Sequence, residues 1–135
     1  MKYKNFNDLD LDFSTNLITW NGEVFSGIAF EILPGDFTEE TMIVGGMKNG
    51  SCKRWFPSGR LQMEEHYSNN SKHGISWVWF EEGKLHKEAV YEFSIKLREK
   101  EWNLDGKLIR DYKIDTSSGN YDTLVTLRER YRFRN

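Results

Sequence analysis

The feature that most constrains this chain is a seven-residue phrase that occurs three times. WFPSGRL occupies residues 55–61, WFEEGKL occupies 79–85 and WNLDGKL occupies 102–108. Each phrase begins with tryptophan, has glycine at its fifth place and ends in leucine. Glycine adopts positive φ without steric cost, and a glycine at a fixed place between two β-prone runs predicts a hairpin turn. The chain is therefore expected to contain three similar β-hairpins.

The segments between the phrases indicate how the hairpins follow one another. GGMKNG at 45–50 and NNSKHG at 69–74 are rich in turn residues. Each unit of about 23 residues then holds two strands and two short loops. Because side chains alternate along a strand, Trp55, Trp77, Trp79 and Trp102 are expected on one face, where rings and leucines form the core. The pattern predicts an all-β fold, a single-layer antiparallel sheet of tandem β-hairpin repeats.

The repeat also predicts how the chain is divided. The 135 residues are expected to form one repeat domain. Residues 16–49 form a degenerate first unit, interrupted by an acidic loop, LPGDFTEE, at 33–40. Clearer units follow at 50–73, 74–96 and 97–119, and a capping strand is expected at 121–134.

The C-terminal segment, YDTLVTLRERYRFRN, fits two conformations. A strand would place four arginines on one side, and this alternation favours the capping strand. The four are Arg128, Arg130, Arg132 and Arg134. A helix would instead bury Leu124, Leu127 and Tyr131.

Charge excludes some classes of function and suggests another. The net charge of −2 argues against a nucleic-acid or membrane binder. The charge is uneven, because residues 1–47 hold two lysines against eight acids, whereas residues 48–135 hold 17 bases against 13 acids. Acidic side chains could steer a basic partner into place. The candidate partner-binding residues are Asp8, Asp10, Asp12, Asp36, Glu39 and Glu40.

The residue types that carry catalysis do not form a recognisable motif. Cys52 is the single cysteine, so no disulfide can form within the chain. His66 and His86 could approach one another from different units, with Glu64, Glu65 or Glu88 as a third ligand, but solvated strand faces explain them more simply. No catalytic, cofactor-binding or metal-binding residue is predicted. The N-terminus lacks an apolar signal region, and the protein is expected to be cytoplasmic.

The repeats resemble a known family. NGEVFSGIAFE, WFPSGRL, HGISWVWFEEGKL and WNLDGKL are similar to MORN-type repeats, and more closely to those of bacterial YwqK-like antitoxin proteins, over residues 16–114. Three features depart from the family pattern: Asn70 replaces a turn glycine, Leu97 replaces the first glycine of its unit, and YEFSIKLRE lacks an Asn-Gly turn. The resemblance implies a repeat scaffold that binds another protein.

The resemblance implies the function that we expect. This is a non-catalytic antitoxin or immunity protein, without a cofactor, that binds a cognate bacterial toxin and occludes its active site. The alternative is a structural or membrane-tethering scaffold that binds lipid headgroups or another protein. The four arginines of the C-terminal segment would then make the lipid contact.

Overall fold

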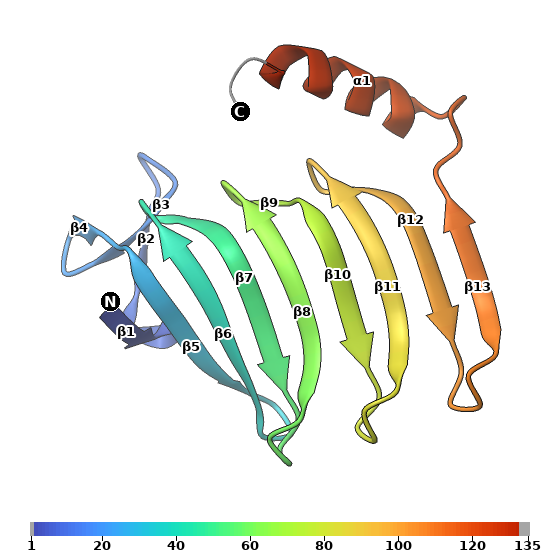
Figure 1. The fold of residues 1–135 in the computed structure, drawn as a ribbon. Helices are drawn as coiled ribbons and strands as arrows, with labels where there is room; N and C mark the ends of the chain where they lie inside the picture. Colours follow the sequence, from blue (N-terminus) through green and yellow to red (C-terminus); the bar gives the residue numbers. More distant parts are fainter. Residues whose placement is uncertain (1, 133–135) are drawn as a thin grey trace.

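The computed structural model describes residues 2–132 and consists mostly of β-strands (Figure 1). The strands in chain order are β1 (Lys2–Asn5), β2 (Asp10–Asp12), β3 (Leu17–Trp20), β4 (Glu23–Val24), β5 (Gly27–Leu33), β6 (Phe37–Val44), β7 (Met47–Trp55), β8 (Leu61–Ser68), β9 (Ser71–Lys72), β10 (Gly74–Trp79), β11 (Leu85–Glu92), β12 (Ile95–Trp102) and β13 (Leu108–Lys113). A short 3-10 helix, η1 (Phe6–Asp8), follows β1, and one α-helix, α1 (Gly119–Tyr131), follows β13.

The predicted all-β sheet of tandem hairpins is confirmed. A ten-stranded sheet has the order β1-β5-β6-β7-β8-β10-β11-β12-β13, with β9 beside β8. Every neighbouring pair is antiparallel except β1 and β5, which are parallel. We call the end of the sheet at the bottom of Figure 1 the lower rim and the opposite end the upper rim.

The three phrases form the three lower-rim turns that the sequence predicted. Gly59, Gly83 and Gly106 have φ of +89°, +97° and +80°. In each turn the residue after tryptophan donates its N–H to the carbonyl four residues on, as in the 2.8 Å bond from Phe56 to Arg60. In each hairpin the strand pairing also shifts register just before the tryptophan, at Trp55, Trp79 and Trp102. Identical local chemistry therefore gives identical turns.

The upper-rim turns keep their shape where the sequence departs from the family pattern. Asn69 and Asn70 have φ of +46° and +71°, and Phe93 and Ser94 have φ of +49° and +63°. The Asn70 side chain accepts a hydrogen bond from the N–H of Lys48, and Ser94 does the same for Lys72. These bonds hold the two turns although neither contains glycine.

The predicted acidic loop at 33–40 is wrong. The connection between β5 and β6 is a tight turn in which Gly35 and Asp36 have positive φ, and β6 already begins at Phe37. Glu39 and Glu40 therefore lie within a strand, where they face opposite sides of the sheet. The pairing of Glu39 with Glu31 and of Glu40 with Phe30 extends the hairpin through the whole segment.

A second layer covers only the N-terminal end of the sheet. The strands β2, β3 and β4 form a small sheet of their own. Phe25, Ala29 and Ile43 form a buried cluster with Phe6, Leu9, Ile18 and Trp20 packed around it. Phe25 and Ile43 of this cluster are each 1% exposed, whereas the tryptophans of the repeats are only half-buried. The expectation that the rings and leucines of the tryptophan row form the core is therefore wrong, because the row is only half-buried.

The predicted capping strand at 121–134 is also wrong, since residues 119–131 form the helix α1. Ser118 caps it by accepting a 3.2 Å hydrogen bond from the N–H of Tyr121. The helix lies across the upper rim (Figure 1) and buries Leu124, which is 1% exposed. The helix buries Leu124 and places Leu127 and Tyr131 on the same side. This burial favours the helix over the strand that the alternation of the arginines suggested. Arg134 lies outside the described residues.

Candidate partner-binding surface

Three of the predicted binding residues lie in the N-terminal layer. Asp8 ends η1, and Asp10 and Asp12 belong to β2. Asp10 is exposed, whereas Asp12 caps a turn by accepting hydrogen bonds of 2.9 and 2.7 Å from the N–H and hydroxyl of Ser14. These hydrogen bonds lower the pKa of Asp12. Asp12 therefore has a local structural role, which leaves Asp8 and Asp10 as the more accessible carboxylates.

The other three predicted residues lie along the β5–β6 hairpin and do not converge. Asp36 is exposed in the lower-rim turn. On one face of the sheet, Glu39 binds Arg54 through two nitrogens at 2.8 and 2.6 Å. On the other face, Glu40 accepts a 2.7 Å hydrogen bond from the hydroxyl of Tyr3. The six acidic residues are therefore spread over the N-terminal third rather than gathered into one patch.

The arginines of the C-terminal segment do not form a stripe. Arg128 donates two hydrogen bonds, of 2.7 and 2.8 Å, to the carboxylate of Glu92 in β11. The hydrogen bond from Arg128 lowers the pKa of Glu92 and raises that of the guanidinium itself. Arg130 follows on the exposed side of α1, and Arg132 is its C-terminal cap. The first arginine thus fastens the helix to the sheet.

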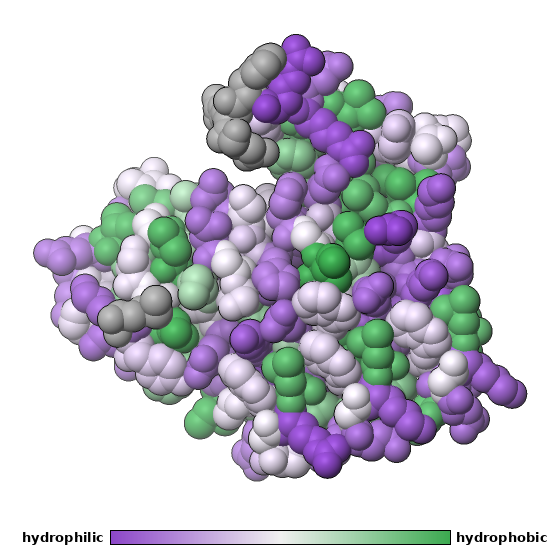
Figure 2. All heavy atoms as spheres, in the orientation of Figure 1, coloured by the Kyte–Doolittle hydropathy of each residue, from purple (hydrophilic) through white to green (hydrophobic). Residues whose placement is uncertain are grey.

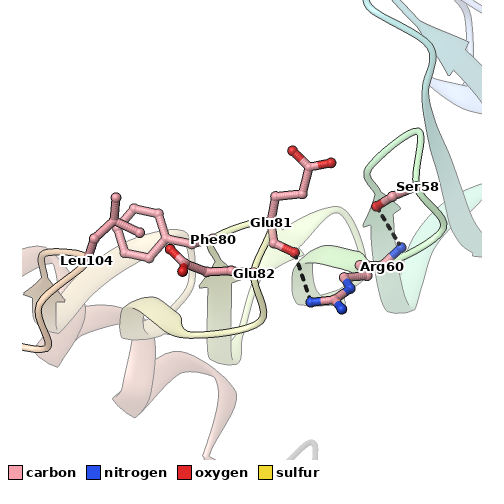
Figure 3. Close-up of a pocket in the computed structure, with 6 residues that line it drawn as sticks. All are labelled: Ser58, Arg60, Phe80, Glu81, Glu82 and Leu104. Carbon is pink, nitrogen blue, oxygen red and sulfur yellow. Dashed lines mark hydrogen bonds between the residues drawn. The ribbon is translucent and has the colours of Figure 1, made fainter.

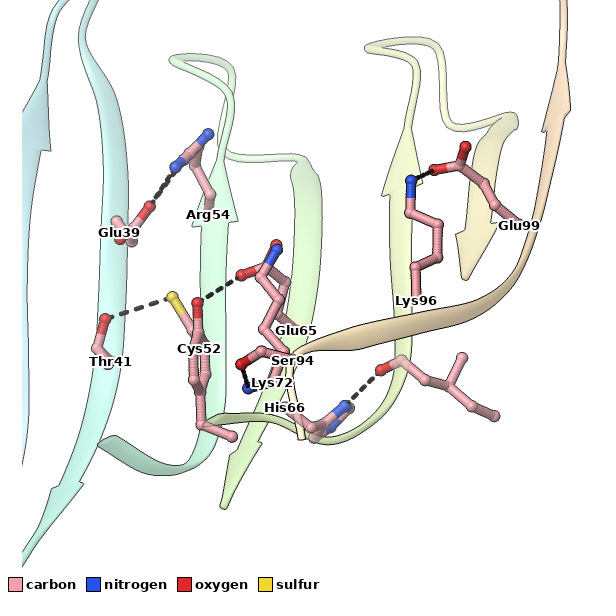
Figure 4. Close-up of polar contacts among 12 residues, drawn as sticks. Glu39, Thr41, Cys52, Arg54, Glu65, His66, Lys72, Ser94, Lys96 and Glu99 are labelled. Carbon is pink, nitrogen blue, oxygen red and sulfur yellow. Dashed lines mark hydrogen bonds and ion pairs between the residues drawn. The ribbon is translucent and has the colours of Figure 1, made fainter. Parts of the chain in front are cut away.

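One face of the sheet, which we call the polar face, carries charges that are paired with each other (Figure 4). Its ion pairs are Glu39–Arg54 at 2.6 Å, Glu65–Lys72 at 2.9 Å, and Lys96–Glu99 at 3.1 Å. Lysines also lie over tyrosine rings at a regular spacing: Lys48 over Tyr67, Lys72 over Tyr91, and Lys96 over Tyr112. Because these charged groups are paired with one another, we interpret the polar face as a network that stabilises the sheet.

Cys52 belongs to that network. Its sulfur lies 3.3 Å from the hydroxyl of Thr41, and both side chains are buried. Burial raises the pKa of the Cys52 thiol to about 11, so it is protonated at neutral pH. Burial also raises the pKa of Tyr67, whose hydroxyl donates to Glu65 at 3.0 Å. Neither group has the ionised form that a nucleophile needs.

The opposite face, which we call the tryptophan face, carries the row that the sequence predicted. The register pairs Trp55 with Leu61, Trp79 with Leu85, and Trp102 with Leu108. Figure 2 shows green and pale side chains alternating along the lower ends of the strands. Trp77 stacks on Trp79 with ring centroids 6.3 Å apart and donates a 3.1 Å hydrogen bond to Glu88.

The outer side of the tryptophan row is open to solvent. Around it, Ile32 is 68% exposed, Tyr3 53% and Ile75 41%. Large apolar side chains on an open face mark an interaction surface when they are contiguous. Alternation in the sequence predicts that the tryptophans share one face, but it does not show whether a second layer covers that face, so it does not distinguish a core from an open surface.

The lower rim has a shallow hollow of about 680 Å³ that is lined by residues from all three repeated turns (Figure 3). Phe80 and Leu104 supply its apolar lining, and Glu81 and Glu82 lie at its edge. The guanidinium of Arg60 donates a 3.3 Å hydrogen bond to the backbone carbonyl of Glu81. The hollow is thus part of the junction between successive repeats.

A second hollow of about 540 Å³ separates α1 from the upper rim. His73, Phe93, Leu127 and Tyr131 line it. Phe93 stacks on Tyr131 with centroids 5.6 Å apart, and Nδ1 of His73 accepts a 3.4 Å hydrogen bond from the N–H of Phe93. This cluster anchors the helix.

The other histidines bind their neighbours. His66 contacts the carbonyl of Ile75 at 2.8 Å and lies 3.6 Å from Glu64. His86 stacks on Phe80 and lies 3.7 Å from Glu101. Among residues 2–132 no three potential metal ligands gather into a site.

No protein-family model matches the chain. No curated protein matches it either. Within the described part of the chain, no helix has the length and apolar character to cross a bilayer.

Proposed function

We propose that the protein is a non-catalytic binding module that neutralises a cognate bacterial toxin by covering its active site. The observation that carries the proposal is the open tryptophan face of the repeat sheet. Tryptophan and tyrosine are enriched among the residues that contribute most to protein–protein affinity. A protein partner offers the broad complementary surface that such a face requires. The resemblance to YwqK-like antitoxins supplies the class of partner.

The rigidity of the array supports the proposal. Successive hairpins are joined at the lower rim by Arg60, which binds the carbonyl of Glu81, and by Lys84, which binds the carbonyl of Leu104 at 2.9 Å. Similar bonds join them at the upper rim, from the N–H of Asn70 to Lys48 and from that of Ser94 to Lys72. A preorganised surface loses little conformational entropy on binding.

The acidic residues have a separate part in the proposal, which is to steer a basic toxin during encounter. Asp8, Asp10 and Asp36 are exposed and are the groups to neutralise first. Changing Glu39 or Glu40 would also break contacts within the sheet. The triple variant of Asp8, Asp10 and Asp36 to Asn should slow association and weaken its salt dependence, with little change in dissociation.

Co-expression with the toxin encoded in the neighbouring reading frame tests the proposal. We expect the wild-type protein to protect cells and Ile32→Glu/Ile75→Glu to fail, because both exposed side chains lie on the tryptophan face. The matched control is Val24→Glu/Val125→Glu, which changes two exposed valines that lie outside the ten-stranded sheet, in β4 and α1. Equal killing with and without the wild-type protein would refute the proposal. Retention on anionic vesicles would favour the membrane-tethering alternative.

A further inference from the structure

We propose that the outer edge of β13 binds an extended acidic segment of a partner protein, which adds to the sheet as a further strand. The inference concerns the mode of docking and does not depend on the partner being a toxin. Three independent features of this edge carry it: its open backbone, the interrupted repeat and the unpaired bases beside it.

The edge is open. Among residues 2–132, β13 pairs with β12 alone, and α1 turns away across the upper rim instead of covering it (Figure 1). Five of the six residues of β13 are exposed, including Leu108 at 49% and Ile109 at 56%. An edge strand presents unpaired N–H and C=O groups, to which an extended peptide can add.

The repeat stops where its next strand would begin. In the first two phrases the base after glycine, Arg60 or Lys84, reaches a backbone carbonyl in the following repeat. Lys107 has the equivalent place in the third phrase, but in the described part of the chain no further hairpin follows β13. In the third repeat, Lys107 is therefore the side chain that corresponds to Arg60 and Lys84, which bind the backbone of the next repeat. An added strand would continue an arrangement that the chain already uses twice.

The charges beside the edge specify what the added strand should carry. Arg98 in β12 lies directly opposite Lys113 in β13, so both are on one face. Within residues 2–132 neither side chain has an ion-pair partner, although Lys53, Lys72 and Lys87 elsewhere in the sheet pair with glutamates. Like charges directly opposite one another destabilise a sheet. A carboxylate on an added strand, opposite Lys113, would pair with that lysine and so weaken its repulsion of Arg98.

A second copy of the chain fits this edge poorly. A two-fold axis that continues the sheet pairs residues that face the same side. The two registers that overlap most of β13 are centred on Arg110 or Asp111, so each places identical charges opposite one another. The other sheet edge, β1, carries Lys2 and Lys4 and would add further bases. The charges therefore favour an acidic strand from a different protein.

Fluorescence anisotropy with synthetic peptides tests the inference. The probe is a labelled, capped peptide of alternating glutamate and valine, about eight residues long so that it spans β13. We expect it to bind the wild-type protein, and to bind about tenfold more weakly when every amide is N-methylated or when lysine replaces glutamate. The first change removes the backbone donors and the second removes the charge complementarity.

A variant of the protein locates the site. Arg98→Ala/Lys113→Ala should bind the acidic peptide about tenfold more weakly, whereas Lys53→Ala/Arg130→Ala, which removes the same charge elsewhere, should bind within about twofold of wild type. Thermal unfolding checks that both variants fold. The inference is overturned if the acidic peptide does not bind, if the N-methylated peptide binds equally well, or if the Arg98→Ala/Lys113→Ala variant keeps wild-type affinity. Sedimentation that shows a dimer displaced by the peptide would also overturn it, because the edge would then bind a second copy.

Discussion

The two ends of the sheet are stabilised in different ways. At the N-terminal end a second layer covers β5 and β6, and Phe25 and Ile43 are each 1% exposed. Across the repeats that layer is absent from the described chain, and the tryptophans are half-buried between cross-strand neighbours. The first end depends on burial of apolar area, and the second on turns, ring contacts and ion pairs. The same kind of substitution should therefore change the free energy of unfolding by different amounts at the two ends of the sheet.

The largest expected effect is loss of a buried side chain at the N-terminal end. Ile43→Ala should lower the free energy of unfolding by about 2–5 kcal/mol, because it leaves a cavity in the closed cluster. Ile75→Ala on the tryptophan face should cost less than about 1 kcal/mol, since that side chain is 41% exposed. Urea unfolding followed by tryptophan fluorescence measures both. Equal losses would mean that the two ends are packed alike.

Two glycines with the same backbone angle give a sharper test. Gly46 and Gly106 both have φ of +80°. A Cβ at Gly46 would lie 2.8 Å from the Cβ of Leu17 and 3.1 Å from the backbone of Ile18, whereas none of the neighbouring atoms lies within 4 Å at Gly106. Gly106→Ala should therefore cost only the strain of its φ, about 1–3 kcal/mol. Gly46→Ala should lower the free energy of unfolding by more, because the small sheet that contains Leu17 and Ile18 must move to make room for the new Cβ. Chemical denaturation measures the free energy of unfolding of both variants. A larger loss of stability for Gly106→Ala than for Gly46→Ala would contradict the close packing described at Gly46.

The repeats could be predicted because their structure is local. Gly59, Gly83 and Gly106 specify turns through their own φ, and the alternation of side chains then fixes the face of each tryptophan. The N-terminal layer has no such signal, since Phe25 and Ile43 are far apart in sequence and meet only after folding. The position of Arg98 opposite Lys113 likewise depends on the register of two strands, which composition does not show.

The C-terminal helix shows how a local pattern can mislead. The alternation of Arg128, Arg130 and Arg132 is compatible with a strand, but arginine is also a good helix former, so the alternation does not require a strand. Ser118, placed to cap a helix, and the spacing of Leu124 and Leu127 were the better signals. The segment around Glu39 and Glu40 misleads in a similar way, because its acidic residues suggest a loop although they pair along β6.

The contact between Glu92 and Arg128 makes the docking of α1 depend on pH. The folded-state pKa of Glu92 lies below its usual value. The contribution of this group to stability is therefore present above its unfolded pKa, near 4.5, and is lost as the pH falls through the folded value. Because the pair is largely solvent-exposed, the effect should stay below about 1 kcal/mol.

Hydrogen exchange in α1 measures this effect. Between pH 7 and pH 3.5 the wild-type helix should lose protection relative to the strands, and Glu92→Gln should show the weaker protection already at pH 7. The matched control is Glu82→Gln in a lower-rim turn, which should leave the helix unchanged. Identical protection in Glu92→Gln and wild type at pH 7 would show that Leu124 and the Phe93–Tyr131 stack suffice to hold the helix.

The smallest expected effect comes from the open end of the sheet and has the opposite sign. Lys113→Gln removes one of two opposed bases and should raise the free energy of unfolding by about 0.2–1 kcal/mol. Lys107→Gln removes an equal charge from the adjacent turn, where no base lies directly opposite, and should change stability less. Thermal unfolding at low salt resolves the difference, which should shrink as added salt screens the repulsion. A substitution that stabilises the protein and weakens capture of the acidic peptide would mark Lys113 as a residue kept for binding. Destabilisation by Lys113→Gln would show that the opposed bases do not repel, and the edge of β13 would then lose its preference for an acidic strand.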